Sequence, residues 1–181
     1  AITFDDGPSG EFTPQILDLL KAHGARATFF MVGDAAQRHP DLVRRVVAEG
    51  HAVGNHTWNH TALPSLHEAG FTEQVDRTQA LLAALGAHPL TCLRPPFGKI
   101  TGSARALAAR RGLTVLRWTS DTEDWKLPGA DLIVSRALDG AVPGGVILMH
   151  DSGPDMHQTV AALPAILDGI HARGLSFAPA C

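Results

Sequence analysis

Short apolar runs alternate with longer amphipathic segments along the chain. The short runs are rich in β-branched and aromatic residues, and they predict strands at Ala1–Phe4, Ala27–Val32, His51–Gly54, Thr91–Leu93, Thr114–Trp118, Gly145–Met149 and Leu175–Ala178. The longer segments have apolar residues at helical spacing, and they predict helices at Thr13–His23, Pro40–Glu49, Ser65–Leu85, Ser103–Arg111, Asp131–Leu138 and Thr159–Arg173. Strand–helix–strand repeats of this kind predict a parallel sheet with helices outside it.

This alternation continues over residues 1–181 without a linker, a charge block or a low-complexity segment. We therefore expect a single domain. A complete eight-unit barrel usually needs about 250 residues, which is more than this chain has. The sequence predicts an α/β fold, namely a distorted or incomplete (β/α) barrel with about seven parallel strands. An open doubly wound sheet is the alternative.

Ionisable residues follow five of the expected strands on their carboxyl side. They lie in the segments Asp5–Asp6, His56–His60, Arg94–Phe97, Asp121–Trp125 and His150–Asp151. The carboxyl ends of parallel strands meet on one face of a barrel, where enzymes of this architecture hold their active sites. We therefore expect the active site at the C-terminal strand ends.

A metal site is one interpretation of the first two segments. His56 and His60 are four residues apart, and on one helical turn this spacing would direct both rings to the same side. The adjacent carboxylates of Asp5 and Asp6 cannot both be buried without positive charge. Two histidines and one carboxylate suit Zn²⁺ with an open position for water. The same donor set also fits an Fe(II) oxygenase, but that interpretation leaves Arg94 unexplained. Surface or helix-capping roles are the structural alternative.

Other strand-end residues have two interpretations each. Arg94 could hold a carboxylate or be an ordinary surface arginine. His150 follows a strongly apolar strand and could transfer protons beside a carboxylate such as Asp124, or be structural. Trp125 and Leu148 could line a small apolar pocket or belong to the core.

Composition excludes several classes of protein. The net charge is −3 and the 15 basic residues are scattered, so no nucleic-acid partner is expected. No apolar run approaches the roughly 18–20 residues that span a bilayer. Two cysteines are too few for a disulfide-dense scaffold.

Seven of the ten histidines are expected on the surface or as caps: His23, His39, His51, His67, His88, His157 and His171. Of these, His157 alone lies in a loop where it could touch a substrate.

Taken together, five segments resemble the motifs of the polysaccharide deacetylases, also called carbohydrate esterase family 4 or the NodB homology domain. The matching segments are Thr3–Ser9, His56–His60, Arg94–Phe97, Asp121–Trp125 and Leu148–His150. They occur in the order of the family's motifs and cover nearly the whole chain. One residue departs from the pattern, because the family usually has Tyr where this chain has Phe97. A side-chain hydroxyl is lost there, whereas the backbone N–H remains.

The resemblance implies a metal-dependent hydrolase that removes acetyl groups from glycans containing N-acetylglucosamine, such as chitin, chitooligosaccharide or peptidoglycan. An O-acetyl esterase that acts on acetylated xylan is the alternative within the family. The resemblance also implies roles for ten residues: Asp6, His56 and His60 as ligands of a divalent metal, most often Zn²⁺ with Co²⁺ possible; Asp5 as general base, oriented by Arg94; His150 as general acid, tuned by Asp124; the Phe97 N–H as oxyanion donor; Trp125 and Leu148 as walls of the acetyl pocket.

A carbohydrate-binding or scaffolding domain without catalysis is the alternative from another class, and the intact set of acidic residues and histidines argues against it.

We expect an acetylated glycan as the partner, a monomer, and a secreted or cell-envelope location, although the chain contains no signal peptide. Export favours a disulfide between Cys92, at the end of a strand, and Cys181, just after the last expected strand. Two buried thiols are the alternative.

Overall fold

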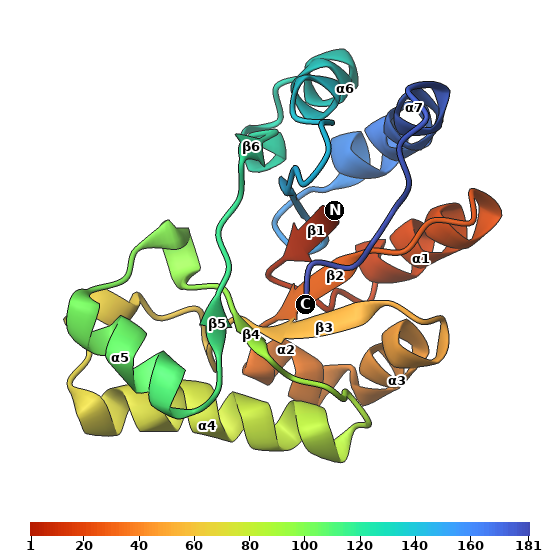
Figure 1. The fold of residues 1–181 in the computed structure, drawn as a ribbon. Helices are drawn as coiled ribbons and strands as arrows, with labels where there is room; N and C mark the ends of the chain where they lie inside the picture. The colour runs from red at the N-terminus through yellow and green to blue at the C-terminus, as the bar shows by residue number, and fades with distance from the viewer.

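Seven parallel strands form one curled sheet with helices packed around it (Figure 1). The computed structural model describes residues 1–181, with Ser65 described by its backbone alone. The strands of this described chain are β1 (Ile2–Asp5), β2 (Thr28–Met31), β3 (Ala52–Asn55), β4 (Cys92–Leu93), β5 (Thr114–Val115), β6 (Ser120–Asp121) and β7 (Ile147–His150). Their order is β5-β4-β3-β2-β1-β7-β6, and every neighbouring pair is parallel. The predicted incomplete barrel is confirmed.

Helices follow most of the strands and cover the outside of the sheet (Figure 1). They are α1 (Phe12–Ala22), α2 (Gly33–Arg38), α3 (Pro40–Ala48), α4 (Glu68–Ala84), α5 (Gly102–Arg110), α6 (Ala130–Asp139) and α7 (His157–Ala172). Three short 3₁₀ helices complete the described chain: η1 (Leu63–Ser65), η2 (Pro96–Gly98) and η3 (Asp124–Lys126). The sequence did not predict α2, because its six residues are too few to show a helical period.

One expected strand is wrong, and one strand was not expected. The segment Leu175–Ala178 is irregular, and the Leu175 N–H bonds back to the carbonyl of Ile170 at the end of α7. Instead, Ser120 and Asp121 form β6 beside β7. A strand of two polar residues is too short to show an alternating pattern, so the sequence placed these residues in a loop.

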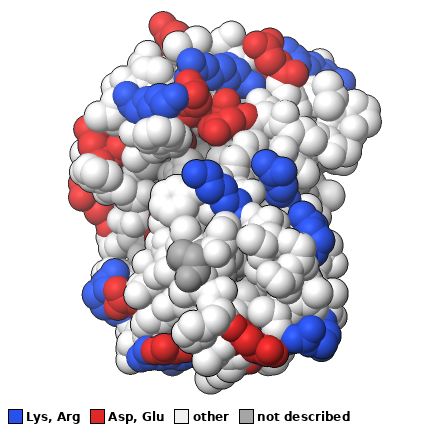
Figure 2. Space-filling view, turned by 90° about the vertical axis from the view of Figure 1, so that its left-hand side faces the viewer, with Lys and Arg blue, Asp and Glu red and all other residues white. Residues whose placement is uncertain are grey.

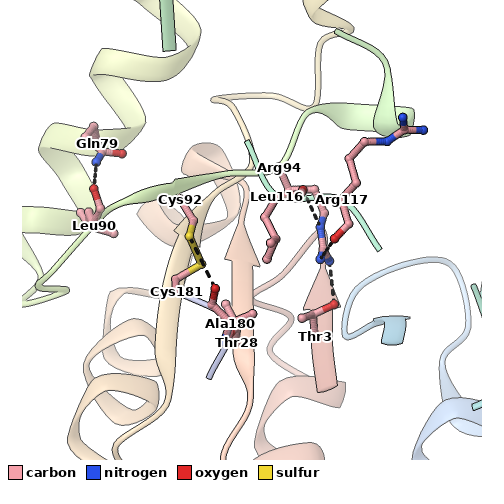
Figure 3. Close-up of a disulfide and its surroundings, with 10 residues drawn as sticks. All are labelled: Thr3, Thr28, Gln79, Leu90, Cys92, Arg94, Leu116, Arg117, Ala180 and Cys181. Carbon is pink, nitrogen blue, oxygen red and sulfur yellow. Dashed lines mark hydrogen bonds between the residues drawn. A yellow bond between two sulfur atoms is a disulfide. The ribbon is translucent and has the colours of Figure 1, made fainter. Parts of the chain in front are cut away.

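The barrel does not close by strand pairing. β5 and β6 are the two edges of the sheet although they are consecutive in the chain, so the segment Leu116–Thr119 has to cross the opening. Arg94, which follows β4, holds this crossing segment from inside the barrel. Its Nε and Nη2 donate to the carbonyls of Leu116 and Arg117, both at 3.4 Å (Figure 3).

Side chains along β1 alternate between the helices and the barrel interior. Ile2 and Phe4 belong to the main hydrophobic core, which lies between the sheet and the helices. Thr3 and Asp5 face the other way, and both accept hydrogen bonds from Arg94. The two-residue period of a strand therefore delivers a carboxylate into a buried interior.

The C-terminal tail crosses the sheet and ends in a disulfide. The Ala180 N–H donates to Thr28 Oγ1 at 2.8 Å, and Cys181 is bonded to Cys92 on β4 (Figure 3). The predicted disulfide is confirmed, although the tail reaches β4 without forming a strand. In the part of the chain that the structure describes, no helix has the length and apolar character needed to cross a lipid bilayer.

Candidate active site

A cavity of about 390 Å³ opens at the carboxyl ends of the strands. Its lining residues are Asp5, Asp6, His56, His60, Phe97, Trp118, Asp121, Trp125, Leu148 and His150. The structure therefore brings together the residues that the motifs select. Arg94 and Asp124 do not line the cavity but are fully buried behind it. A larger cleft of about 510 Å³ lies at the other ends of the strands, and no ionisable side chain lines it.

Asp5 is held by a buried arginine. The Arg94 guanidinium donates from Nη1 to Asp5 Oδ1 and to Thr3 Oγ1, both at 2.7 Å. It also lies 4.1 Å from the centre of the Phe30 ring, which packs against its face. The guanidinium and the carboxylate thus form a charge-assisted hydrogen bond inside the barrel. Asp5 Oδ2 remains near His56 Nε2, at 3.7 Å.

Asp6, His56 and His60 present their donor atoms to one point. Asp6 Oδ1 lies 3.3 Å from His56 Nε2 and 3.2 Å from His60 Nε2, and the three ligand atoms fall within 4.8 Å of one another. Asp6 Oδ1 is buried without a hydrogen-bond partner among the described residues. His56 Nδ1 lies 2.7 Å from the Arg94 carbonyl oxygen, which can only accept, so Nδ1 carries the ring proton. His56 Nε2 therefore presents a lone pair, as a metal ligand must.

Electrostatics favour a cation at the same point. Burial lowers the pKa of the His56 imidazole, but the charges of Asp5 and Asp6 outweigh burial and raise that pKa overall. Burial likewise opposes ionisation of Asp6, yet the close approach of His56 and the charges of both histidines lower the pKa of Asp6. Positive charge is stabilised between these groups, and the three donors fit a divalent cation.

The two histidines lie in a loop and not on a helical turn. Residues 56–60 form an irregular loop in which Thr57 and His60 have positive φ angles of 68° and 60°. The side chain of Gln74 on α4 accepts hydrogen bonds from two N–H groups of this loop, those of Trp58 and Asn59. The loop thus brings the ring centres of His56 and His60 to 5.0 Å, whereas the sequence showed only their spacing.

His150 is held by Asp124 on the opposite side of the cavity. Its Nδ1 lies 2.7 Å from Asp124 Oδ1, and its backbone N–H donates to Asp124 Oδ2 at 2.8 Å. Asp124 also accepts hydrogen bonds from the Trp125 N–H and the Thr159 hydroxyl, at 3.0 and 2.9 Å. Four donors thus converge on one fully buried carboxylate. The ring proton on Nδ1 of His150 is therefore fixed toward Asp124.

Burial alone would lower the pKa of His150. The hydrogen bond and charge of Asp124, with the charges of Asp5 and Asp6, raise the pKa instead to about 9. His150 is therefore an imidazolium at neutral pH, with a second acidic proton on Nε2. Such a group can donate a proton in the cavity.

Three of the predicted site residues have left-handed backbones. Asp6, His60 and Phe97 have φ angles of 74°, 60° and 59°, which side chains other than glycine adopt at a cost of about 1–3 kcal/mol each. At Phe97 this conformation lies within η2, and its N–H has no acceptor among the described residues. An oxyanion could therefore accept from that N–H.

An apolar wall lies beside these polar groups. Leu148 is buried, whereas Phe97 and Trp125 are 63% and 55% exposed at the rim. Trp118 completes the wall and was not among the predicted site residues, because it looked like the last residue of a strand. Its ring packs against Gly98, where an added Cβ would lie 2.8 Å from a ring atom.

Sequence reasoning also missed a buried support beneath Asp6. Asp151 Oδ2 accepts from the Thr13 hydroxyl at 2.5 Å, and that hydroxyl accepts from the Ser9 N–H at 2.7 Å. Burial raises the pKa of Asp151 to about 7. A Cβ at Gly7 would lie 2.2 Å from Asp151 Oδ2, so the turn after Asp6 rests directly on this carboxyl group. The one sequence signal for this support was that an acidic residue, Asp151, follows an expected strand.

One of the remaining histidines, His51, departs from the expected surface or capping position. His51 is buried, and its Nδ1 accepts a hydrogen bond from the Ala27 N–H. His157 begins α7 and pairs with Asp155 at 2.8 Å, and it does not line the described cavity. His67 caps α4 as expected.

A family model and several known proteins are similar to this chain. The family model named polysaccharide deacetylase matches residues 1–116. The chain belongs to the polysaccharide deacetylase family. A peptidoglycan-N-acetylglucosamine deacetylase of Bacillus cereus is 39% identical over 178 residues, which are 98% of this chain and 65% of that protein. This member of the family thus spans slightly less than two thirds of that relative's length.

Two further proteins support the assignment to this family. A chitooligosaccharide deacetylase of Sinorhizobium fredii is 38% identical over 184 residues, covering 96% of this chain and 86% of that protein. The crystal structure of the Bc1960 peptidoglycan N-acetylglucosamine deacetylase, bound to a naphthalenyl N-hydroxybenzamide, superposes with a TM-score of 0.96 at 37% identity. That match covers 99% of this chain and 85% of the other chain. The family and its curled sheet are therefore established for this chain.

Proposed function

We propose that this chain is a metal-dependent deacetylase that removes the acetyl group from N-acetylglucosamine residues of a glycan. The observation that carries the proposal is the convergence of three polar units on one cavity. These units are Asp5 held by Arg94, the ligand set around Asp6, and His150 held by Asp124. The names of the relatives, which denote deacetylases of peptidoglycan and of chitooligosaccharide, support the substrate class.

Asp6, His56 and His60 would hold the metal. Two imidazoles and one carboxylate suit Zn²⁺ best, and Co²⁺ has similar preferences. When bound, such an ion supplies Lewis acidity, which polarises the acetyl carbonyl and lowers the pKa of water.

The protein's own groups carry the protons. Asp5 takes a proton from the attacking water, and Arg94 orients Asp5 for this task. The Phe97 N–H donates to the oxygen that becomes negative in the tetrahedral intermediate. His150 then delivers its Nε2 proton to the departing amine, because an amine cannot leave as its anion. Asp124 stabilises the imidazolium until that transfer.

The apolar wall selects the acyl group. Leu148, Trp125 and Trp118 leave room beside the ligand set for a small apolar group such as the acetyl methyl. The cavity is open, so the glycan itself can remain outside while one acetyl group enters. Residues of one chain complete this cavity, which supports a monomer.

Two observations support work outside the cytoplasm. The disulfide between Cys92 and Cys181 persists only in an oxidising compartment. Peptidoglycan, the substrate in the name of the Bacillus relative, is a polymer of the cell envelope. We therefore include a secreted or cell-envelope location in the proposal.

Acetate release tests the proposal. The Zn²⁺-loaded protein is incubated in parallel with N-acetylglucosamine oligomers, with peptidoglycan and with acetylated xylan. We expect acetate from at least one of the first two substrates and little from xylan. Preference for xylan would identify an O-acetyl esterase. Release from none of the three by folded, metal-loaded protein would favour a binding domain without catalysis.

A further inference from the structure

Two exposed basic residues, Lys99 and Arg117, flank one side of the cavity mouth. Lys99 follows η2, two residues after Phe97, and Arg117 directly precedes Trp118; Phe97 and Trp118 both line the cavity. The contact between Gly98 and the Trp118 ring brings these two segments together. Both basic residues therefore belong to the same rim, which we call the basic rim.

The charges of the basic rim are not neutralised by the protein. No ion pair joins Lys99 or Arg117 to any other described residue. Three other exposed or half-buried basic residues are paired: Lys126 and Arg136 with Glu123, and Arg110 with Glu68. The carboxyl ends of the strands lie on the left in Figure 1, and Figure 2 turns that side toward the viewer. Basic side chains gather near the middle of this face with no acidic side chain between them (Figure 2).

Free cations at the mouth of the cavity have a consequence for the substrate. If the acetyl group enters the cavity, the neighbouring sugars of the glycan must pass over its rim. A neutral N-acetylglucosamine polymer offers only hydroxyl and amide groups there. A glycan whose alternate sugars carry an ether-linked acid and a peptide offers carboxylates, with which lysine and arginine form charge-assisted hydrogen bonds.

We infer that Lys99 and Arg117 bind a carboxylate that the glycan carries beside the deacetylated sugar. The preferred substrate is then an anionic, acid-substituted N-acetylglucosamine polymer of the peptidoglycan type, rather than neutral chitooligosaccharide. This inference rests on the proposed function. The Phe97 and Trp118 wall positions the acetyl group, and the basic rim selects the chain that carries it.

The test compares the two glycan classes. Acetate release is measured on a soluble peptidoglycan glycan fragment and on a neutral N-acetylglucosamine oligomer of equal length. The proteins are the wild type and the double variant Lys99→Gln, Arg117→Gln. Exposed ion pairs are each worth a few-fold in binding, so the ratio of kcat/KM for the anionic to the neutral substrate should fall about ten-fold in the double variant. In 1 M salt the Debye length is about 3 Å, and the difference between the proteins should shrink accordingly.

Two controls make the result specific. Arg110→Gln removes an exposed basic residue that already has a partner, and it should leave the ratio unchanged. Conversion of the fragment's carboxylates to methyl amides should abolish the wild type's preference. An unchanged ratio in the double variant, or a preference that survives amidation, would overturn the inference. Binding of the fragment, measured by calorimetry, keeps the question decidable even if the wild type releases no acetate, which would refute the proposed function alone.

Discussion

Two adjacent carboxylates of this site, Asp5 and Asp6, have different partners. Asp5 and Asp6 are adjacent, yet Asp5 faces Arg94 and Asp6 faces the two histidines. Under the proposed function the two residues have different tasks: Asp5 would accept a proton, and Asp6 would hold a cation. Substitutions can separate these tasks.

Asp5→Asn should keep the metal and lose nearly all turnover. The amide has almost the same shape as the carboxylate, but it cannot accept a proton from water. Metal content by atomic emission and acetate release give the two readouts on one preparation. A variant that has lost its metal would show that Asp5 is a ligand, and the roles of Asp5 and Asp6 would have to be exchanged.

His60→Ala should lower metal occupancy, because it removes one of three ligands. Competition with a chromogenic chelator measures the metal affinity. Loss of a residue that only orients a ligand lowers metal affinity about 10–100-fold, so loss of a ligand itself should lower it at least as much. His67→Ala is a matched control on the next helix, where it removes a cap instead of a ligand. Equal affinity in His60→Ala and the wild type would exclude His60 from the ligand set.

His150→Ala should distinguish amide from ester hydrolysis. We expect a loss of about 10²–10⁴-fold on an N-acetylglucosamine oligomer, which is the usual contribution of a positioned general acid. The loss should be clearly smaller on an O-acetylated sugar, because an alkoxide leaves with less help from acid. Equal losses on both substrates, with the metal retained, would make His150 structural.

The same residue predicts a pH dependence. The pKa of His150 is raised to about 9, so the proton donor is present below that pH and is lost above it. In the wild type, kcat/KM for the N-acetylated oligomer should therefore fall as the pH rises through about 9. His150→Ala should lack this alkaline limb. A limb that persists in the variant would belong to another group.

At the scale of elements, the site depends on how loops are fixed after the strands. The turn after β1 rests on Asp151, which follows β7, through the hydroxyl of Thr13 on α1. The loop after β3 is held by Gln74 on α4. In both cases a helix that follows a strand supports the loop after that same strand, and these loops carry Asp6 and the two histidines.

Thr13→Val should weaken both the fold and the metal site. It leaves the half-buried Ser9 N–H and the buried Asp151 Oδ2 without their shared partner, and an unsatisfied buried group costs about 1–3 kcal/mol. Urea unfolding measures the first effect, and chelator competition measures the second. Thr13→Ser retains the hydroxyl and should behave like the wild type. Unchanged metal affinity in Thr13→Val would show that this support does not reach Asp6.

The sequence predicted more of the site than of the elements that carry it. Strand ends marked by Asp5, His56 and His150 were visible, because acidic residues and histidines interrupt apolar runs there. The two-residue strand β6 and the short helix α2 were not, since neither is long enough to show a period. Thr13 and Trp118 were missed because their roles arise from partners distant in sequence.

At the scale of the whole molecule, a disulfide joins the C-terminal tail to β4. Cys92 and Cys181 are separated by 89 residues, and the bond spans nearly half of the chain. In the entropic model a loop of this length stabilises the folded state by about 4 kcal/mol. Cys92 also lies two residues before Arg94, at the N-terminal side of the strand and away from the cavity.

Replacement of both cysteines by serine should therefore lower the melting temperature by about 10 °C, at roughly 2–4 °C per kcal/mol for a chain of this size. Acetate release at 25 °C should change little, since neither cysteine lines the cavity. Non-reducing mass analysis of the wild type gives the state of the bond directly. Two free thiols, or equal melting temperatures with and without reductant, would contradict the prediction.

Because the sheet is open between β5 and β6, one side chain, Arg94, contributes both to the stability of the fold and to the candidate active site. Arg94 holds the segment that crosses this opening and also holds Asp5, and removal of one partner of a buried ion pair costs about 3–5 kcal/mol. Domains of ordinary stability have only about 5–15 kcal/mol in total. A variant that loses Arg94 must therefore regain stability elsewhere before it can acquire a new activity. The unclosed sheet thus limits how far the active site of this fold can change.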